Sequence, residues 1–422
     1  MTKPFDVAAR AEWRANWRVV LGAAIGMGTG ASLFSLNASL FITSFGNEFG
    51  WSRGDMGLAG AGAFIAGALT IGIMGRILDH VGFRKVVLVC VPMMALVYLG
   101  LTLMNGAYAM YVALLVVAGT FGGGTAAMVY TRPVVAVFDR QRGLALACAA
   151  SGTSLATILF APVLGAAIEN YGWRAGAYGL VVLTLFVGLP LALALIGRAR
   201  EMKAVEEGEL AVGAAPAVEL TLAEAVRGPT FWLLAGALVA VNIPGSGVVG
   251  QLAPMITDKG LSDTAAGVAM STYAGGLLTG RLITGFALDR FAAPYVAAVM
   301  TCIPAIGTAL LLIPDPSLAL ALFAVALIGL QQGSEIDLLA YFVSRTFGTK
   351  NYGSIYGAIA TAGALSTATG LVLFGKVHDW TKTYDIALIV GTVAFVVGAM
   401  AFLAVKYVKR PNGEAAPHPS RG

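Results

Sequence analysis

The chain has 422 residues, of which 58% are hydrophobic and 12% are charged, with 54 glycines. Soluble domains carry about 25% charged residues, so this composition excludes an ordinary soluble protein. The net charge of +5 follows the pattern of a membrane-topology signal, which argues against a nucleic-acid-binding surface.

Apolar runs long enough to cross a bilayer recur along most of the chain. A helix needs about 20 mostly apolar residues to span about 30 Å of hydrocarbon. The sequence therefore predicts an all-α polytopic membrane protein with twelve transmembrane helices. The predicted spans are 18–43, 54–78, 84–104, 108–137, 143–168, 175–197, 229–256, 263–288, 294–314, 318–346, 352–375 and 384–407. The N-terminal segment is too polar for a signal peptide, so the first span is expected to be retained.

The positive charges predict how the helices are oriented. With a cytoplasmic N-terminus, 20 of the 27 lysines and arginines fall on the inner side. The exceptions are Arg53, Arg174, Lys259, Lys376 and Lys382 on the outer side, and Arg132 and Arg281 within spans. Cytoplasmic loops carry the excess of lysine and arginine, so both termini are expected in the cytoplasm, with the protein in the cytoplasmic membrane.

A polar interval separates two groups of six helices. The predicted parts are a cytoplasmic N-terminal segment (1–17), a six-helix bundle (18–197), a cytoplasmic linker (198–228), a second six-helix bundle (229–407) and a cytoplasmic tail (408–422). The two halves repeat a Gly-x3-Asp pattern, at Gly75 and Asp79 and again at Gly285 and Asp289. Parallel repeats around a site at the membrane midplane are typical of one kind of secondary transporter.

Arg281 is the candidate anchor for an anionic substrate. It lies in a glycine-rich apolar segment, and the nearest acid in sequence is Asp289, two turns further on. A charged residue in a membrane helix costs about 2.5–3.5 kcal/mol on insertion scales, so it normally faces a bundle interior or a water-filled cavity. The planar guanidinium can hold a carboxylate through two parallel hydrogen bonds. The alternative is a structural ion pair with an acid on another helix.

The loop Gly75-Arg76-Ile77-Leu78-Asp79-His80-Val81-Gly82-Phe83-Arg84-Lys85 and the 6+6 layout resemble the major facilitator superfamily across nearly the whole chain. Phe49-Gly50-Trp51-Ser52-Arg53, Arg142-Gly143-Leu144-Ala145, Asn351-Tyr352-Gly353 and the arginine on the eighth predicted helix look like its monocarboxylate and oxalate–formate branch. The resemblance implies a conformational gate made by Gly75, Asp79, Gly82, Arg84 and Asp139, with Asp289 as a weaker counterpart. The alternative is a set of solvated loop charges, in which each surface pair contributes about 0–1 kcal/mol.

The resemblance also bears on the substrate. Oxalate exchangers that resemble this chain use a second basic residue on helix 11, and the matching position here is Ile359. Two carboxylates sharing one cation would leave one charge poorly compensated, which favours a monocarboxylate over oxalate. Tyr356 falls where those exchangers have an aromatic residue. Gln332 and Ile336 replace their aromatic residues on helix 10.

Glu335 and Asp337 are two carboxylates within the tenth predicted helix. Burial favours the neutral form of a carboxyl group, so either residue could bind a proton. The resemblance implies transport of the substrate anion together with a proton. The alternative is a gate or a static pair with Arg132, which lies at roughly the equivalent depth in the fourth helix.

Uncharged polar residues within spans are candidates for lining a cavity. Asn37, Tyr130 and Asn242 are the three selected here. The alternative for each is an interhelical hydrogen bond, which contributes about 0.6 kcal/mol on average in a membrane protein.

These features predict a secondary active transporter for a small monocarboxylate such as lactate or pyruvate, working by alternating access with proton symport. Four alternatives stay open: an oxalate–formate type of anion exchanger, a drug exporter of the same superfamily, an anion channel and a membrane-embedded enzyme. The sequence contains no catalytic constellation, metal-ligand motif or cofactor motif, so no catalytic residue, metal or cofactor is expected. The expected partners are a small organic anion, a proton and the lipid bilayer, without nucleic acid, and a monomer is expected.

Overall fold

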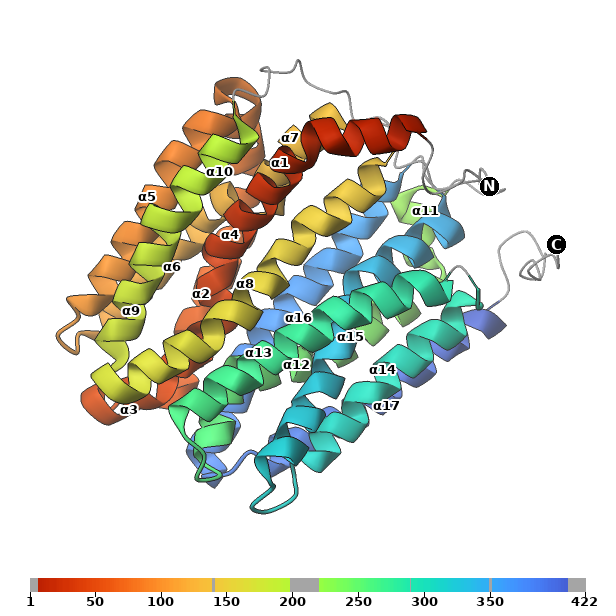
Figure 1. The fold of residues 1–422 in the computed structure, drawn as a ribbon. Helices are drawn as coiled ribbons and strands as arrows, with labels where there is room; N and C mark the ends of the chain where they lie inside the picture. The colour runs from red at the N-terminus through yellow and green to blue at the C-terminus, as the bar shows by residue number, and fades with distance from the viewer. Residues whose placement is uncertain (1–6, 139–140, 198–219, 289, 349–350, 409–422) are drawn as a thin grey trace. The chain divides into compact units, whose positions relative to one another are not determined.

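The computed structural model describes residues 7–138, 141–197, 220–288, 290–348 and 351–408, and within these ranges its regular structure is helical (Figure 1). The longer helices of the first half are α1 (Val7–Thr29), α2 (Ala31–Asn37), α3 (Ile42–Phe49), α4 (Arg53–Val81), α5 (Phe83–Thr102), α6 (Tyr108–Gly122), α7 (Ala127–Val137), α8 (Arg142–Tyr171), α9 (Trp173–Val181) and α10 (Leu189–Ile196). Those of the second half are α11 (Leu222–Arg227), α12 (Pro229–Thr257), α13 (Asp263–Leu288), α14 (Ala293–Leu310), α15 (Leu318–Phe347), α16 (Tyr352–Thr381) and α17 (Asp385–Ala404). Four short turns, η1 (Ala38–Phe41), η2 (Gly123–Thr125), η3 (Val182–Gly188) and η4 (Val405–Tyr407), adjoin them. The predicted all-α class is confirmed.

Each predicted span overlaps one helix or a run of consecutive helices, although the span predicted at 294–314 extends four residues past the end of α14 at Leu310. By length and apolar character, the described residues contain ten single membrane spans, or eleven when the bent pair Arg10–Thr29 and Ala31–Phe49 is counted as one more. The 26-residue helix α13 is long enough to cross but does not reach the same apolar threshold. Its glycines, its threonines and Arg281 lower its mean hydropathy.

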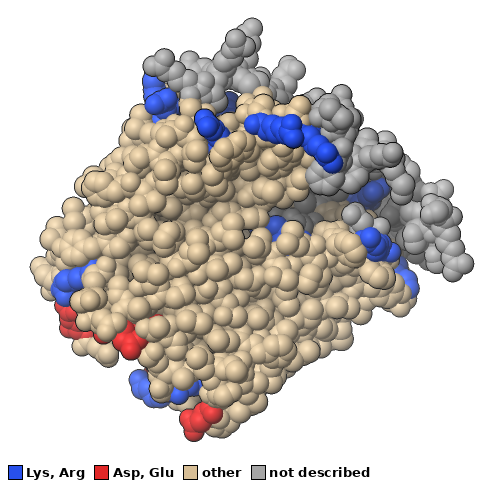
Figure 2. Space-filling view, viewed as in Figure 1, with Lys and Arg blue, Asp and Glu red and all other residues tan. Residues whose placement is uncertain are grey.

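Large apolar side chains are exposed on the outer faces of the helices. On α17, Ile386, Val390, Val393 and Val397 are 46% to 58% exposed. Their spacing of three or four residues puts them on one face of the helix. The charged side chains visible in Figure 2 gather toward the helix ends and leave a broad uncharged surface between them. An apolar surface of this kind is stable against lipid rather than water, so the chain is a multi-pass membrane protein.

The chain divides into two compact units. Unit 1 contains Met1–Ser52, Leu58–Gly208 and Leu252–Ser271, and unit 2 contains Arg53–Gly57, Glu209–Gln251 and Thr272–Gly422. The first turn of α4 therefore belongs to unit 2, and the connection from α12 to α13 belongs to unit 1.

Unit 1 is organised around α1, which packs against α7, α8 and α10 (Figure 1). The helix line bends by 45° at Gly30, between α1 and α2. The Thr125 hydroxyl accepts a hydrogen bond from the Ala31 backbone N–H at 2.9 Å, and a Cβ on Gly30 would lie 2.8 Å from the Thr125 carbonyl oxygen. A side chain at position 30 would therefore push η2 away from the bend.

Unit 2 contains a close helix crossing between α13 and α15. Cβ atoms on Gly276, Gly280, Gly329 or Gly333 would each overlap or crowd the backbone of the opposite helix, so the two backbones touch without side chains between them. Small residues at four-residue spacing permit this approach in membrane proteins. The crossing fixes the height of α13 relative to α15, and with it the positions of the polar residues on both.

The short helix α11 is attached to the end of α15. The backbone N–H of Leu220 donates to the Phe347 carbonyl at 3.0 Å, and Asn351 Nδ2 donates to the Leu220 carbonyl at 3.0 Å. The helix begins with a capping box, in which the Thr221 hydroxyl accepts from the Glu224 backbone N–H at 3.3 Å and the Glu224 carboxylate accepts from the Thr221 backbone N–H at 2.8 Å. The Thr221 hydroxyl also donates to the Glu224 carboxylate at 2.8 Å. These bonds hold the pKa of Glu224 below its usual value. Most of the predicted linker, at 198–219, lies outside the described residues.

Candidate functional site

Arg281 lies on α13 at the level of the glycine crossing. A Cβ on Gly333 of α15 would lie 3.0 Å from the Arg281 backbone nitrogen, so these two residues are at the same depth. The Arg281 side chain is partly buried and interacts with another group of the protein. The arginine is therefore placed next to the part of α15 that carries the predicted glutamine and acids. Its role as a substrate anchor stays a prediction.

Glu335 is the centre of a polar cluster that joins α12 to α15. Asn242 Nδ2 on α12 donates to Glu335 Oε1 at 2.7 Å, and Gln332 Nε2 donates to Glu335 Oε2 at 2.8 Å. Asn242 is 5% exposed. A Cβ on Gly245 would lie 2.8 Å from Gln332 Oε1, so the glycine provides the room that this glutamine occupies. Three residues selected from sequence are thus brought together, and the carboxyl group is held by neutral amides.

Arg132 and Asp337 are the other two residues predicted to take part in proton coupling or in the gate. Arg132 Nη1 on α7 donates to the Leu78 carbonyl in α4 at 3.0 Å. Asp337 belongs to α15, but its side chain lies outside the described residues.

The two candidates from unit 1 lie among close-packed side chains. Asn37 is fully buried at the end of α2, where its Nδ2 donates to the Leu33 carbonyl at 2.7 Å. Tyr130 is 1% exposed, with its ring against Gly26 and edge-on to Phe83. Whether either residue contacts a substrate stays a prediction.

Tyr356 and Ile359 lie on α16. Tyr356 is partly buried and packs beside a hydrophobic cluster, and Ile359 belongs to the core of that cluster and is fully buried. The position where similar oxalate exchangers carry a second base is therefore filled by an aliphatic side chain in a dry core.

Three of the predicted gate residues, Gly75, Gly82 and Arg84, lie around the connection between α4 and α5. Gly82 has a φ of +82°, a conformation that glycine adopts without strain, and Arg84 is exposed on the first turn of α5. Gly75 faces Met128, because a Cβ there would lie 3.7 Å from the Met128 sulfur. The side chains of Asp79, Asp139 and Asp289 lie outside the described residues. The gate therefore stays a prediction.

A charged cluster in unit 2 was not selected from sequence. The backbone N–H groups of Arg53 and Gly54, at the start of α4, donate to the Asp379 carboxylate at 3.1 and 2.9 Å. Lys376 lies between Asp55 at 2.9 Å and Asp379 at 4.0 Å. The sequence shows that Lys376 and Asp379 are three residues apart, a spacing that puts them on one face near the end of a predicted helix. This spacing alone does not show which other helix the two side chains contact.

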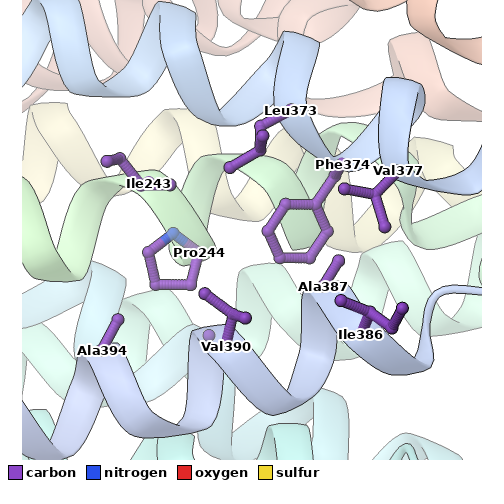
Figure 3. Close-up of a pocket in the computed structure, with 10 residues that line it drawn as sticks. Ile243, Pro244, Leu373, Phe374, Val377, Ile386, Ala387, Val390 and Ala394 are labelled. Carbon is purple, nitrogen blue, oxygen red and sulfur yellow. The ribbon is translucent and has the colours of Figure 1, made fainter.

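One apolar cavity of about 200 Å³ lies between α12, α16 and α17 (Figure 3). The rings of Pro244 and Phe374 border it, together with Val390 and seven further apolar residues. Its lining offers no hydrogen-bond donor to an anion, so it is not a binding site for a carboxylate. Within the described part of the chain there is also no group of three or more His, Cys, Asp or Glu side chains placed to hold a metal.

The fold and the buried polar cluster define a multi-pass membrane protein with polar side chains enclosed among its helices. A family model described as Major Facilitator Superfamily matches residues 20–371. The chain belongs to that superfamily, which confirms the broader of the two resemblances. The monocarboxylate and oxalate–formate branch stays a prediction.

Individual relatives are distant. Monocarboxylate transporter 13 of Rattus norvegicus is 25% identical over 297 residues, covering 68% of this chain and 66% of the relative. The uncharacterized MFS-type transporter YhjX of Escherichia coli (strain K12) is 28% identical over 144 residues, covering 33% and 35%. A chloramphenicol resistance protein of Streptomyces lividans is 32% identical over 266 residues, covering 61% of each. The chain thus spans between about a third and two thirds of the curated relatives it matches.

Solved structures support the fold. A D-xylose-proton symporter has 15% sequence identity and a TM-score of 0.71, with 95% of this chain and 99% of that chain covered. A bacterial homolog of the human lysosomal transporter Spinster has 16% identity and a TM-score of 0.64, covering 92% and 93%. At this identity the likeness concerns the arrangement of helices and not the transported solute.

Proposed function

We propose that the protein carries a small monocarboxylate such as lactate or pyruvate across the cytoplasmic membrane by alternating access, together with a proton. The observation that carries this proposal is Arg281, a cation on a membrane helix at the depth of the α13–α15 crossing. A carboxylate there could be held by two charge-assisted hydrogen bonds. The likeness to a monocarboxylate transporter supports the same substrate class.

Six residues selected from the sequence are proposed to contact the substrate. They are Arg281, Gln332, Asn242 and Tyr356 from the second half of the chain and Asn37 and Tyr130 from the first half. The buried Ile359 supports a single negative charge on the substrate, because it supplies no second cation at that position. The excess of lysine and arginine in the predicted inner loops supports cytoplasmic termini.

Arg281→Gln in proteoliposomes tests the proposal. The uptake of labelled lactate or pyruvate should fall by about 100-fold or more, because a neutral amide loses both the charge and the paired donors, which is equivalent to about 3 kcal/mol. Arg281→Lys should recover only part of the rate, since an ammonium group lacks the planar pair of donors.

Arg345→Gln is the matched control, since Arg345 is an exposed arginine in the last turn of α15. It should leave uptake unchanged. Retention of carboxylate uptake by Arg281→Gln, at a normal amount of folded protein, would contradict the proposed anchor.

Drug export is the second candidate function, because the chain is 32% identical to a chloramphenicol resistance protein over 266 residues. Chloramphenicol is uncharged at neutral pH and does not need a cationic anchor. Arg281→Gln should therefore leave drug export intact if this second function is the true one, and cells expressing the wild-type protein should then tolerate more drug than cells without it.

A further inference from the structure

The apolar cavity between α12, α16 and α17 reaches the lipid-facing surface of the helices. Ile386 and Val390 line it from α17, and their side chains are 52% and 56% exposed on the apolar face of that helix (Figure 3). Leu373 lines it from α16 and is 38% exposed. Because lining residues of both helices also lie at the surface, a molecule of the surrounding bilayer can enter the cavity from the side.

The surrounding side chains leave this cavity unfilled. The Phe374 ring is buried and packs against Gly247, where a Cβ would overlap it, so the ring is held at the border of the cavity. An apolar cavity of about 150 Å³ stays dry and binds benzene. The cavity here, of about 200 Å³, therefore has room for a short stretch of hydrocarbon chain. Its apolar lining offers no partner to water.

An exposed lysine lies in the connection between the two helices that form the mouth of this cavity. Lys382 directly follows α16, whose Val377 lines the cavity, and comes four residues before Ile386 of α17, which also lines it. Its backbone has a φ of +61°, the left-handed conformation that glycine usually supplies at a helix end. Within the described residues, Lys382 forms no ion pair. A cation is thus present beside the cavity at a position where a side chain is unfavourable for the backbone.

The depth of the cavity matches the distance between the headgroup and the chains of a phospholipid. A bilayer of about 40–45 Å with about 30 Å of hydrocarbon leaves about 5–8 Å for the headgroups on each side. Val377 and Leu373 precede Lys382 by five and nine residues, which places them about 8 and 14 Å from it along the helix. Trp380 is 77% exposed, and tryptophan is enriched at the membrane interface. A phosphate group at Lys382 would therefore put the first carbons of its acyl chain at the cavity.

We propose that this cavity binds one acyl chain of a phospholipid whose phosphate group pairs with Lys382. The chain supplies the apolar contacts that the lining of an empty cavity lacks. The ammonium group supplies a charge-assisted hydrogen bond to the phosphate. Asp385, an exposed acid in the first turn of α17, weakens the attraction of a free anion to the same place. The occupant is therefore a lipid, which is held by its chain as well as by its phosphate.

The bound chain would contact α12 next to the α12–α15 polar cluster. Pro244 borders the cavity and lies two residues after Asn242, which donates to Glu335. A proline inside a helix removes one backbone hydrogen bond, so this part of α12 has less support from its own helix. A chain packed against the Pro244 ring would stabilise this segment in the folded protein, whichever solute the protein carries.

Thermal unfolding of the full chain, stripped of lipid in detergent, tests the proposal. The probes are phosphatidylglycerol and a diacylglycerol with the same two chains, which lacks the phosphate. A ligand that binds only the folded protein stabilises it by mass action, so phosphatidylglycerol should raise the thermal midpoint by about 2–4 °C. Diacylglycerol should need a concentration about tenfold higher for the same rise, because it makes no charge-assisted hydrogen bond. Native mass spectrometry should show phosphatidylglycerol retained on the wild-type chain.

Two variants separate the phosphate contact from the chain contact. Lys382→Gly removes the ammonium group and suits the left-handed backbone, so it should keep or raise the midpoint without lipid. It should respond to phosphatidylglycerol no better than to diacylglycerol. Ala394→Leu extends a lining side chain into the cavity and should abolish the response to both lipids. Val393→Leu, on the exposed face beside it, is the control and should respond as the wild type does.

Three results would overturn the proposal. The first is a Lys382→Gly variant that still prefers phosphatidylglycerol to diacylglycerol, since the phosphate would then lie elsewhere. The second is an Ala394→Leu variant that responds as the wild type does, which would mean that the lipid only coats the outer surface. The third is a wild-type chain whose midpoint neither lipid changes. None of these results bears on carboxylate transport, which is measured separately by uptake.

Discussion

Two polar clusters in unit 2 hold carboxylates by opposite means. In the α12–α15 cluster, Glu335 accepts hydrogen bonds from the neutral amides of Asn242 and Gln332. In the α4–α16 cluster, Asp379 accepts from two backbone N–H groups and lies beside Lys376, which also contacts Asp55. One cluster contains an acid without a cationic partner in the described residues, and the other contains two acids around a lysine.

The difference follows from where each cluster lies along its helices. The Lys376 and Asp55 side chains are 36% and 43% exposed at helix ends, so water shares in solvating their charges. The α12–α15 cluster lies among buried residues, where an isolated charge is costly. An ion pair suits the first place, and a carboxyl group held by neutral hydrogen-bond donors suits the second. The comparison therefore separates a partly solvated ion-pair cluster from one in which neutral amides hold a carboxyl group.

The largest expected effect comes from removing the support of the α12–α15 cluster. In Gly280→Ala, the new methyl group would overlap the Leu330 carbonyl, and α13 and α15 would have to separate. Overpacking of this kind costs about 1–3 kcal/mol, and here the obstacle is backbone that has no rotamer to change. We expect a clear fall in the thermal midpoint in detergent together with loss of transport.

Gly275→Ala is the matched control one turn earlier, since no atom lies within 4 Å of its added methyl group. It should be neutral or stabilising by up to about 1 kcal/mol, because alanine favours a helix over glycine. Equal effects of the two substitutions would show that helix propensity, and not the crossing, accounts for the result.

The predicted spans could be placed from sequence because hydrocarbon selects long apolar runs irrespective of tertiary contacts. The breaks within them could not be placed in the same way. The bend at Gly30 depends on a hydrogen bond from Ala31 to Thr125, which lies 94 residues further along the chain. The seven-residue π-helical turn η3 likewise has no local sequence signal, and its Thr184 hydroxyl donates to the Thr29 carbonyl of α1.

The candidate site could be predicted as a set of residues but not as a set of contacts. Arg281, Asn242 and Glu335 were selected because polar groups in apolar helices are costly, and Gln332 was selected through the resemblance to oxalate exchangers. The pairing of Asn242 with Glu335 joins residues 93 positions apart, and only the packing of α12 on α15 shows it. The sequence also could not show that Gln331 Oε1 is buried without a hydrogen-bond partner, because this is a property of the folded protein.

A smaller effect is expected for Asn242→Leu, which removes one of the two amide donors to Glu335. Leaving a buried acceptor unsatisfied costs about 1–3 kcal/mol, and the cost is greater for a charged group. The amide stabilises the charged form of Glu335, so the loss of stability should grow as the pH rises. Thermal midpoints across a pH series measure this.

The double variant Asn242→Leu with Glu335→Gln is the control for that pH dependence. With no ionisable carboxyl group left in the cluster, the effect of Asn242→Leu should become independent of pH. A pH-dependent effect that persists in the double variant would show that another group titrates there.

The smallest effect is expected for Lys376→Gln in the α4–α16 cluster. Exposed ion pairs contribute about 0–1 kcal/mol, and Asp379 keeps its two backbone donors when the lysine is lost. Salt should weaken the effect further, because the Debye length falls to about 3 Å at 1 M ionic strength. The effect of Asn242→Leu should not respond to salt in this way, since its hydrogen bond lies among buried residues. A Lys376→Gln variant that loses more stability than Asn242→Leu, or whose loss persists in high salt, would mean that the charged cluster is as dry as the amide cluster. The contrast between a solvated ion pair and a carboxyl group held by buried amides would then no longer explain why unit 2 uses two different kinds of partner for its carboxylates.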